Sequence, residues 1–455
     1  MALASATTSE LINYSNNDKF SCKNIDGLNI ANNYIKKLIE YVNNLQESDA
    51  GVLFTGYDAR FTKEENQMSM IGKQLQKVTL AIMDNNIDEI IKTKGIDPKE
   101  YYLAMSGGVA LNCPMNSYLM NKYKFKGFIS TPHVSDSGMS IGIGLYHFYK
   151  EMGKFDFHLK NAFYGDEGDL NAFLDKGEFS EYIASVTPDE TAEQIIEDIQ
   201  TDAIVWFYGR AEIGPRGLGH RSILADPRTE KSQITLNQVK QRQWWRPVAP
   251  IVLEEAASDW FEDVYPSPYM LHTFKIKEDK LKEVPAIAHI DKSARIQTVN
   301  QNDDAKLYEV LSAFYDKTGV PILCNTSLND RGEPIINTIE EAMNFALRKG
   351  FKVMYVNSAR LVLQNQECYQ ETEPYKRRYS DFMLYKTQEE RQQLVKELNP
   401  YDLPMETLVF YFQNDRIRNN YSLTDSKDAK KLLRLSDLTY RMMGFANTED
   451  ATIRH

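Results

Sequence analysis

The sequence lacks the features that mark secreted, membrane-spanning and general nucleic-acid-binding proteins. Its four cysteines are scattered, form no Cys-x-x-Cys pair, and accompany no basic-then-apolar leader. No stretch approaches the roughly 20 apolar residues that are needed to cross a bilayer. A formal charge of -11 argues against a general nucleic-acid binder, which needs a positive field to displace counterions from phosphates. We therefore expect a cytoplasmic protein without a membrane or nucleic-acid partner, in which any phosphate binding is local.

The 455 residues are enough for two or three domains, each with a core of its own. Apolar residues at helical spacing predict amphipathic helices over 29–45 and 68–82. The first residues are rich in Ser, Asn and Thr, and a polar, irregular stretch over 155–189 indicates a domain boundary. The predicted organisation is a loose polar arm (1–26), a first lobe (27–165), a second domain (166–365) and a C-terminal extension of unknown role with helical patterns (366–455).

The first lobe contains two consecutive strand–turn–helix units, which predict a parallel α/β sheet. Their turns are Ser106-Gly107-Gly108 and Asp136-Ser137-Gly138. The expected elements around these turns are strands over 101–105 and 127–130 and helices over 109–123 and 139–152.

Each of the two turns has a chemical and a structural interpretation. At Gly107 and Gly108, the start of a helix and the absence of Cβ atoms would let a phosphate approach the main chain, but a tight connecting turn fits equally well. Asp136 lies where a carboxylate could ligate a metal beside bound phosphates. From the residues alone, a helix cap is the more frequent role for such an aspartate.

The second domain concentrates basic residues in what we interpret as loops. Residues 209–228 hold four arginines and four glycines, an anomaly in an acidic protein. Arginine offers a rigid fork of donors to phosphate or carboxylate oxygens. The alternative is a solvated turn whose arginines pair with Glu212 and Asp226. Strands in this domain are expected over 203–208, 248–253, 270–276 and 320–323.

Further polar residues in the second domain add to this group. A strand-like alternation would put Lys240 and Arg242 on one face, and Arg295 is a third cation. Ser327 and Asn329 follow the strand predicted over 320–323 and fall on one side of the chain. Together these residues predict a phosphate-binding constellation with almost no general base and no obvious nucleophile. Such a set suits phosphoryl or adenylyl chemistry by positioning and charge neutralisation.

Four ordered motifs in the sequence resemble the nodulation-factor, cephamycin and tobramycin O-carbamoyltransferases, over about residues 27–365. The motifs are Gly107-Gly108-Val109-Ala110-Leu111-Asn112-Cys113, the run from Gly214 to Arg228, Arg246-Pro247-Val248-Ala249-Pro250, and Thr318 to Asn329. The resemblance implies a partial actin-like (ASKHA-type) lobe, then an α/β domain like threonylcarbamoyladenylate synthase, and a helical tail. It also implies that the second domain makes carbamoyladenylate from carbamoyl phosphate and ATP, and that the first transfers the carbamoyl group to a hydroxyl.

The resemblance further assigns roles to individual residues. The catalytic set matches Lys240, Arg242, Ser327 and Asn329. Carbamoyl phosphate is assigned to Arg295, with Arg216 and Arg221 less securely placed. The nucleotide is assigned to Gly107, Gly108, Asn112 and Gly138, and Asp136 matches a metal-ligating aspartate, which raises the ligand interpretation above the cap.

One departure from the family is large. Family members normally begin with another lobe that carries a His-x-x-x-His metal pair, and no two histidines here have that spacing. We expect a divalent metal (iron, or magnesium or manganese) held with histidines from a partner chain, so that this chain is one subunit of a split enzyme or a fragment. The alternatives are a non-catalytic scaffold subunit of a biosynthetic complex and an enzyme that only forms the adenylate. The acceptor is left open among sugar, amino-alcohol and polyketide hydroxyls, as in antibiotic biosynthesis.

Overall fold

The computed structural model describes residues 5–14, 25–129, 131–157 and 159–375, with the side chains of 25–30 left out. The chain divides into two compact units, residues 1–329 with 335–370, and residues 330–334 with 371–455. Most of the second unit, including most of the predicted helical tail, lies outside the described residues. Within its described part, the Asp330 N–H donates to the carboxylate of Glu333. The helices and strands of the described chain belong to the first unit.

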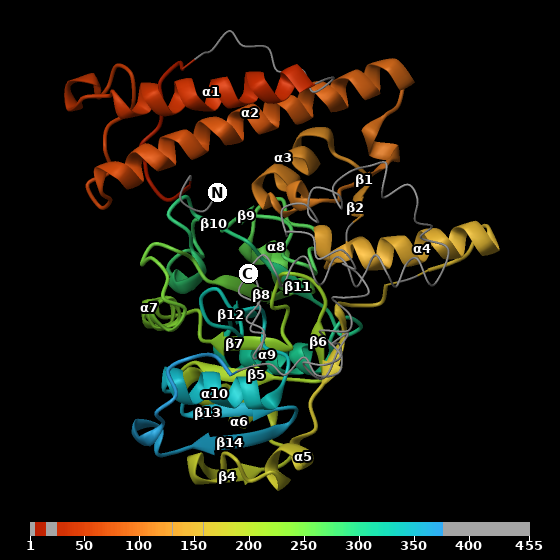
Figure 1. Ribbon diagram of the computed structural model, residues 1–455, viewed down its shortest axis with the longest axis vertical. Helices are drawn as coiled ribbons and strands as arrows, with labels where there is room; N and C mark the ends of the chain where they lie inside the picture. Colours follow the sequence, from red (N-terminus) through yellow and green to blue (C-terminus); the bar gives the residue numbers. More distant parts are fainter. Residues whose placement is uncertain (1–4, 15–24, 130, 158, 376–455) are drawn as a thin grey trace, which may run out of the picture. The chain divides into compact units, whose positions relative to one another are not determined.

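Two long helices, α1 (Ile25–Asn43) and α2 (Lys63–Lys94), confirm the predicted amphipathic pair and pack against each other (Figure 1). A capping box begins α2, because Thr62 and Glu65 each accept a hydrogen bond from the other's backbone N–H, at 3.1 and 3.0 Å. Gly95, in the left-handed conformation, ends it. The core beneath these helices consists of Leu11, Tyr34, Leu38, Val42, Leu45, Phe54 and Met70.

The polar arm is corrected in part, because residues 5–14 are not loose. Ala6 and Ser9 are fully buried and Leu11 is nearly so. The Ser9 hydroxyl donates to the side-chain oxygen of Asn66 at 2.5 Å, and Lys73 donates to the carbonyls of Thr7 and Ser9. The polar composition therefore serves a buried hydrogen-bond network, which sequence composition alone does not distinguish from a solvated arm.

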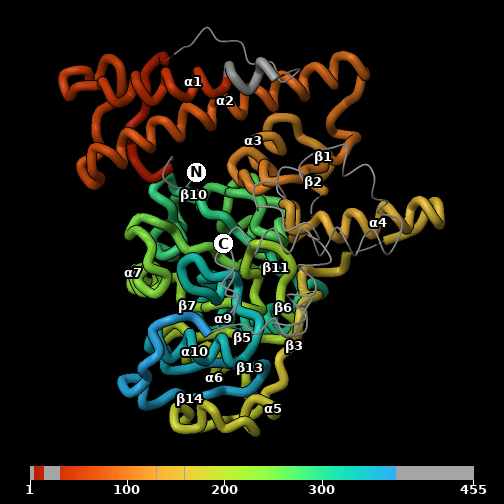
Figure 2. The backbone as a smooth tube through the Cα atoms, viewed as in Figure 1, coloured from red at the N-terminus to blue at the C-terminus, as the bar shows by residue number. Residues whose placement is uncertain are grey.

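The two strand–turn–helix units of the first lobe are confirmed. Strand β1 (Tyr102–Ala104) pairs in parallel with β2 (Gly127–Ile129), and the helices that follow are α3 (Cys113–Tyr123) and α4 (Met139–Met152). The tube in Figure 2 follows this path from β1 to α4. None of the side chains of α4 is buried. Its large exposed apolar residues are Met139, Ile143, Tyr146, Phe148, Tyr149 and Met152.

An eight-stranded mixed sheet forms the centre of the second domain (Figure 1). Its order is β11 (Gln297–Val299), β8 (Ala249–Leu253), β12 (Ile322–Ser327), β7 (Arg221–Ala225), β5 (Ile204–Phe207), β13 (Val353–Val356), β14 (Ala359–Leu363) and β4 (Ile183–Thr187). Helix α9 (Ala305–Thr318) packs on β8 and β12, α10 (Ile339–Lys349) on β5 and β13, and α6 (Ala192–Thr201) on α9. The central strands β5 and β7 are buried along their whole length, so the core lies at this sheet.

The remaining strands and helices of the second domain are short. Two small antiparallel sheets are formed by β3 (Phe163–Glu167) with β6 (Arg210–Glu212) and by β9 (Phe274–Lys275) with β10 (Ser293–Ala294). The short helices are α5 (Leu170–Asp175), α7 (Glu230–Val239) and α8 (Ala257–Trp260). Strand β3 spans the boundary predicted at residue 165.

Three sequence predictions for the second domain need correction. Residues 209–228 are not one loop, because they contain β6 and the central strand β7. Strand β12 continues through Ser327, so Asn325 and Ser327 lie in the strand and not after it. The strand predicted over 270–276 is reduced to the two residues of β9. Polar and charged residues in β7 and β12 are buried and hydrogen-bond to backbone atoms of adjoining segments, which overrides the rule that polar runs form loops.

Candidate functional site

Lys240, Ser327 and Asn329 are brought together as predicted. Lys240 is 3% exposed and caps the C-terminus of α7. Its ammonium group donates to the Ser327 carbonyl at 2.8 Å and to both the carbonyl and side-chain oxygens of Asn329 at 2.5 Å. The Ser327 hydroxyl donates to the Asn329 side chain at 2.7 Å. The end of β12 and the residues just after it are therefore fixed around one buried cation.

Lys240 and Arg242 do not belong to a strand. Gln241 between them has a φ of +49°, so the chain turns sharply there. The turn sends the two cations to different places, since Lys240 contacts the end of β12 whereas Arg242 lines a cavity. The strand alternation that was expected to bring both to one anion is therefore wrong, and of the two only Arg242 lines the cavity.

A cavity of about 530 Å³ holds four arginines, which are Arg216, Arg242, Arg246 and Arg295. Its volume falls within the range of small-molecule sites. Burial, together with neighbouring arginines that include Arg295 for both, lowers the pKa of Arg216 and of Arg242 to about 10. The four arginines concentrate positive charge in this cavity, although the protein as a whole is acidic.

These arginines lack the partners that buried cations usually have. In the part of the chain that the structure describes, none of the four pairs with a carboxylate. The Nε atoms of Arg216, Arg246 and Arg295 are buried without a hydrogen-bond partner. The four arginines are partly buried, and partly buried charges without partners are costly, so an anion in the cavity would make the arrangement favourable.

Two glycines explain how Arg216 reaches the cavity. A Cβ on Gly217 would lie 2.7 Å from the Cα of Ser327, and one on Gly214, whose φ is +103°, would lie 2.2 Å from the Pro132 carbonyl oxygen. The arginine-bearing loop therefore passes between the end of β12 and the turn that precedes Asp136. Here the glycines serve close backbone packing and not direct phosphate contact.

Arg221 is a correction to the predicted carbamoyl phosphate set. It is fully buried in β7, and its guanidinium lies 3.6 Å from the ring centroid of Phe207. It donates to the carbonyls of Tyr208 at 2.8 Å and Asp166 at 2.9 Å. Its Nε atom, like those of three cavity arginines, has no hydrogen-bond partner among the described residues, but Arg221 does not line the arginine cavity and its terminal nitrogens bind backbone carbonyls.

Three of the four residues assigned to the nucleotide in the first lobe have structural roles. The Gly107 N–H donates to the Val134 carbonyl at 2.7 Å, which joins the two predicted turns. Asn112 caps α3 by accepting from the Met115 N–H at 3.2 Å, and it also donates to Gln76 at 3.0 Å. A Cβ on Gly138 would lie 2.2 Å from the backbone oxygen of His133, whereas Gly108 faces open space. Nucleotide binding by these residues stays a prediction.

The metal predicted at Asp136 does not fit the residues in this part of the chain. Asp136 is exposed, and the described residues contain no group of three or more His, Cys, Asp or Glu side chains that could hold an ion. His133 is buried, and burial lowers its pKa. We therefore derive no chemistry from a metal at this turn.

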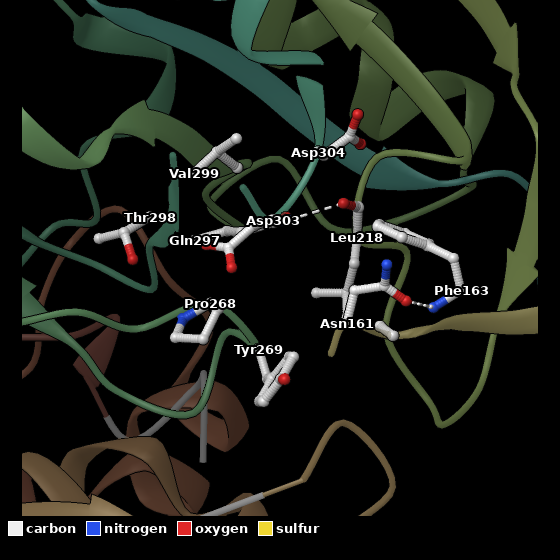
Figure 3. A pocket seen from close by; sticks show the side chains of 11 residues that line it. Asn161, Phe163, Leu218, Pro268, Tyr269, Gln297, Thr298, Val299, Asp303 and Asp304 are labelled. Carbon is white, nitrogen blue, oxygen red and sulfur yellow. Dashed lines mark hydrogen bonds between the residues drawn. The ribbon is translucent and has the colours of Figure 1, made fainter. Parts of the chain in front are cut away.

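A second hollow lies between Asn161, Tyr269 and Asp303 (Figure 3). Its volume is about 20 Å³, which is room for one water molecule. Gln297 donates to the Leu218 carbonyl at its wall at 2.6 Å. This hollow cannot hold a nucleotide, and the arginine cavity is the better candidate site.

A histidine–aspartate pair in the arginine cavity was missed by prediction from the sequence. His289 Nδ1 lies 3.2 Å from Asp291 Oδ1, and both residues line the cavity. Their spacing of two residues and their position just before Arg295 are the only sequence signals that could have pointed to them.

Two family models match this chain. The carbamoyltransferase N-terminus family model matches residues 7–145, and the carbamoyltransferase C-terminus model matches residues 195–363. The chain belongs to the carbamoyltransferase family. Arg216, Lys240, Arg295 and Ser327 all fall within the C-terminal match.

Three relatives illustrate the similarity within this family of transferases. Nodulation protein NolNO of Sinorhizobium fredii is 34% identical over 265 residues, which cover 56% of this chain and 39% of that protein. The 3'-hydroxymethylcephem-O-carbamoyltransferase of Amycolatopsis lactamdurans is 32% identical and covers 57% and 48%. Nodulation protein U of Rhizobium fredii is 34% identical and covers 58% and 45%. The chain thus spans less than half the length of these relatives. No helix in the described residues is long and apolar enough to span a bilayer.

Proposed function

We propose that this chain is part of an ATP-dependent O-carbamoyltransferase. The arginine cavity forms carbamoyladenylate from carbamoyl phosphate and ATP, and the carbamoyl group then passes to a hydroxyl of a small natural-product acceptor. The name of the cephem relative, an O-carbamoyltransferase, supports the class of acceptor. We assign residues 27–165 to a partial actin-like lobe and residues 166–365 to a domain like threonylcarbamoyladenylate synthase.

The single observation that carries the proposal is the set of four arginines without carboxylate partners, among the described residues, in one cavity. Carbamoyl phosphate and the triphosphate of ATP are both multiply anionic, and together they match this local charge. Arginine forks bind phosphate oxygens in pairs, and they neutralise the charge that develops as pyrophosphate leaves. Ser327 and Asn329, fixed by Lys240, supply hydroxyl and amide groups for the nucleotide.

Transfer to the acceptor is proposed to need more than this chain. The relatives are more than twice as long as the part matched here. Any metal at Asp136 must take its other ligands from outside the described residues, and we propose that a separate chain with a His-x-x-x-His pair provides them. The exposed apolar residues of α4 offer a surface that such a chain could cover.

The experiment is carbamoyl phosphate-dependent exchange of labelled pyrophosphate into ATP. We expect exchange by the purified chain and a loss of 100-fold or more, roughly, for Arg295→Ala, because a charge-assisted contact to the transition state is removed. The matched control is Arg210→Ala, an exposed arginine of β6 that does not line the cavity.

Three outcomes separate the candidate functions. Absence of exchange by the wild-type chain contradicts adenylate formation and favours the scaffold alternative. Pyrophosphate exchange that continues unchanged in Arg295→Ala shows that the arginine cavity does not form the adenylate. Exchange without transfer, even after a histidine-bearing partner is added, indicates an enzyme that only forms the adenylate.

A further inference from the structure

His289 and Asp291 form an ordered pair that the arginine-based account of the cavity does not use. The Asp291 Oδ1 atom accepts from His289 Nδ1 at 3.2 Å, from the Ser293 N–H at 3.0 Å and from the Ser293 hydroxyl at 2.5 Å. The His289 N–H donates to the Ser293 carbonyl at 3.0 Å, which closes the turn. The His289 imidazole is therefore positioned by the turn that its backbone N–H closes and by the Asp291 carboxylate. Ser293 in turn fixes that carboxylate.

The contact to Asp291 determines which ring nitrogen is available. A carboxylate only accepts hydrogen bonds, so His289 Nδ1 carries the proton and the neutral ring keeps a lone pair on Nε2. His289 is 7% exposed, and its Nε2 is buried and meets no hydrogen-bond partner among the described residues. A buried, unpaired nitrogen in a ligand-sized cavity is the arrangement expected of a group that acts on a bound molecule.

Asp291 stays ionised in this arrangement. Burial acts to raise its pKa, but the hydrogen bonds from His289 and Ser293 outweigh burial and lower the pKa to about 2. The carboxylate can therefore orient the imidazole and stabilise the imidazolium that forms when Nε2 takes up a proton.

The atom balance of the proposed reaction shows that it needs a proton acceptor. Carbamoyl phosphate and ATP give carbamoyladenylate, pyrophosphate and free phosphate only if one water molecule is consumed. The water must lose its protons as its oxygen forms a bond, so a base beside the anion site would speed the step. Most other titratable groups that line the cavity are poorly suited to accept this proton. The arginines and Lys275 are cations, and the Cys113 thiol donates to the carbonyls of Leu111 and Met270. This leaves His289 and Asp291.

We propose that His289 is the general base of the adenylate-forming reaction and that Asp291 is its positioning residue, an inference that rests on the proposed function. His289 Nε2 takes a proton from water, and the water oxygen attacks the carbonyl carbon of carbamoyl phosphate. The bond from that carbon to the phosphate oxygen breaks, and phosphate leaves with the electron pair and takes up the second proton of the water, so that hydrogen phosphate and carbamate are formed. The carbamate oxygen then attacks the α-phosphorus of ATP, the bond to the β-phosphate oxygen breaks, and pyrophosphate leaves.

The variant His289→Asn tests the assignment. Its amide nitrogen can occupy the place of Nδ1 and still donate to Asp291, whereas no group at the place of Nε2 can take a proton. We expect carbamoyl phosphate-dependent phosphate release and pyrophosphate exchange to fall by about 10²- to 10⁴-fold, the usual contribution of a general base. Asp291→Asn should cause a smaller loss of the same kind.

A bypass separates a base from a structural residue. Ammonium carbamate supplies the carbamate directly, so with ATP it should restore pyrophosphate exchange in His289→Asn and Asp291→Asn to within a few-fold of wild type. Arg295→Ala should fail with both carbamoyl phosphate and carbamate. His289→Gln, checked with His289→Asn by circular dichroism, provides a second variant in case one of them folds poorly.

The outcomes distinguish this inference from the proposed function. Wild-type rates with carbamoyl phosphate in His289→Asn and His289→Gln overturn the base assignment. Loss with both carbamoyl phosphate and carbamate in folded variants also overturns it, because the residue is then needed for binding or shape. A wild-type chain that is inactive with both substrates contradicts the proposed function itself.

Discussion

Replacing Arg242 by methionine should separate stability from function, because the structure places a cation where the described chain offers it no carboxylate partner. Burial, with Arg246 and Arg295 nearby, lowers its pKa from the ordinary 12.5 to about 10. That difference corresponds to roughly 3 kcal/mol against the charged form in the folded chain. Since the folded pKa lies below the unfolded one, this cost is fully present below about pH 10 and is relieved only as the pH rises beyond it. Methionine keeps an apolar stem of similar length, so the ligand-free variant should be as stable as wild type or more stable by about 1–3 kcal/mol.

The same substitution should remove stabilisation by ligand. A ligand present at 100 times its dissociation constant raises the free energy of unfolding by roughly 2.7 kcal/mol. Urea unfolding with and without ATP plus carbamoyl phosphate measures both effects, and Arg210→Met serves as the matched control. If Arg242→Met lowers the stability of the ligand-free chain by more than about 2 kcal/mol and keeps the ligand response, Arg242 has a structural role and does not bind the anion.

The other predictions concern the lysine, one glycine, a buried histidine and the exposed helix. Lys240→Met should lower the free energy of unfolding by about 2–4 kcal/mol in urea, because it leaves buried carbonyl groups without their donor; a smaller loss with activity abolished would show that the lysine acts on substrate. Gly217→Ala should reduce pyrophosphate exchange by displacing the arginine loop, since its Cβ would lie 2.7 Å from the neighbouring strand; wild-type exchange would contradict that packing. Burial lowers the pKa of His272 to about 4, so the wild-type chain should lose about 3 kcal/mol of stability as the pH falls from 6.5 to 4, and His272→Gln should lose less over that range. Ile143→Glu with Tyr146→Glu should reduce self-association in sedimentation velocity and leave exchange unchanged; identical sedimentation would mean that α4 makes no such contact.

The sequence predicted the fold well where local signals and burial agree. Glycine turns between an apolar strand and a periodic helix placed β1, β2 and α4 within a residue or two. Prediction failed where a strand is both buried and polar. Strand β7 opens with Arg221, whose side chain donates to the carbonyls of Tyr208 and Asp166, and no local pattern reveals those partners. A run rich in arginine and glycine was therefore interpreted as a loop although part of it is the centre of the sheet.

The candidate site shows the same limit in a different form. Lys240, Ser327 and Asn329 lie together as the sequence predicted, and their part in phosphate chemistry stays a prediction. The sequence could not predict which of the cations is hydrogen-bonded within the fold and which are left without a carboxylate partner. Lys240 has its donors occupied by backbone and side-chain oxygens, whereas the cavity arginines have none of theirs bonded to a carboxylate in the described chain.

This difference between Lys240 and the cavity arginines indicates which cations stabilise the empty chain and which favour ligand binding. The burial of the lysine is offset locally by oxygen partners and fixes the end of β12, so it contributes stability in the absence of ligand. The arginines lower stability until an anion enters, so the free energy of their burial is recovered only in the bound state, where it favours binding. His289 belongs with the arginines in this respect, because its Nε2 atom is also buried without a partner among the described residues. The residues that act on substrate should therefore be those whose replacement leaves the empty chain as stable as before, and this criterion requires no knowledge of the acceptor.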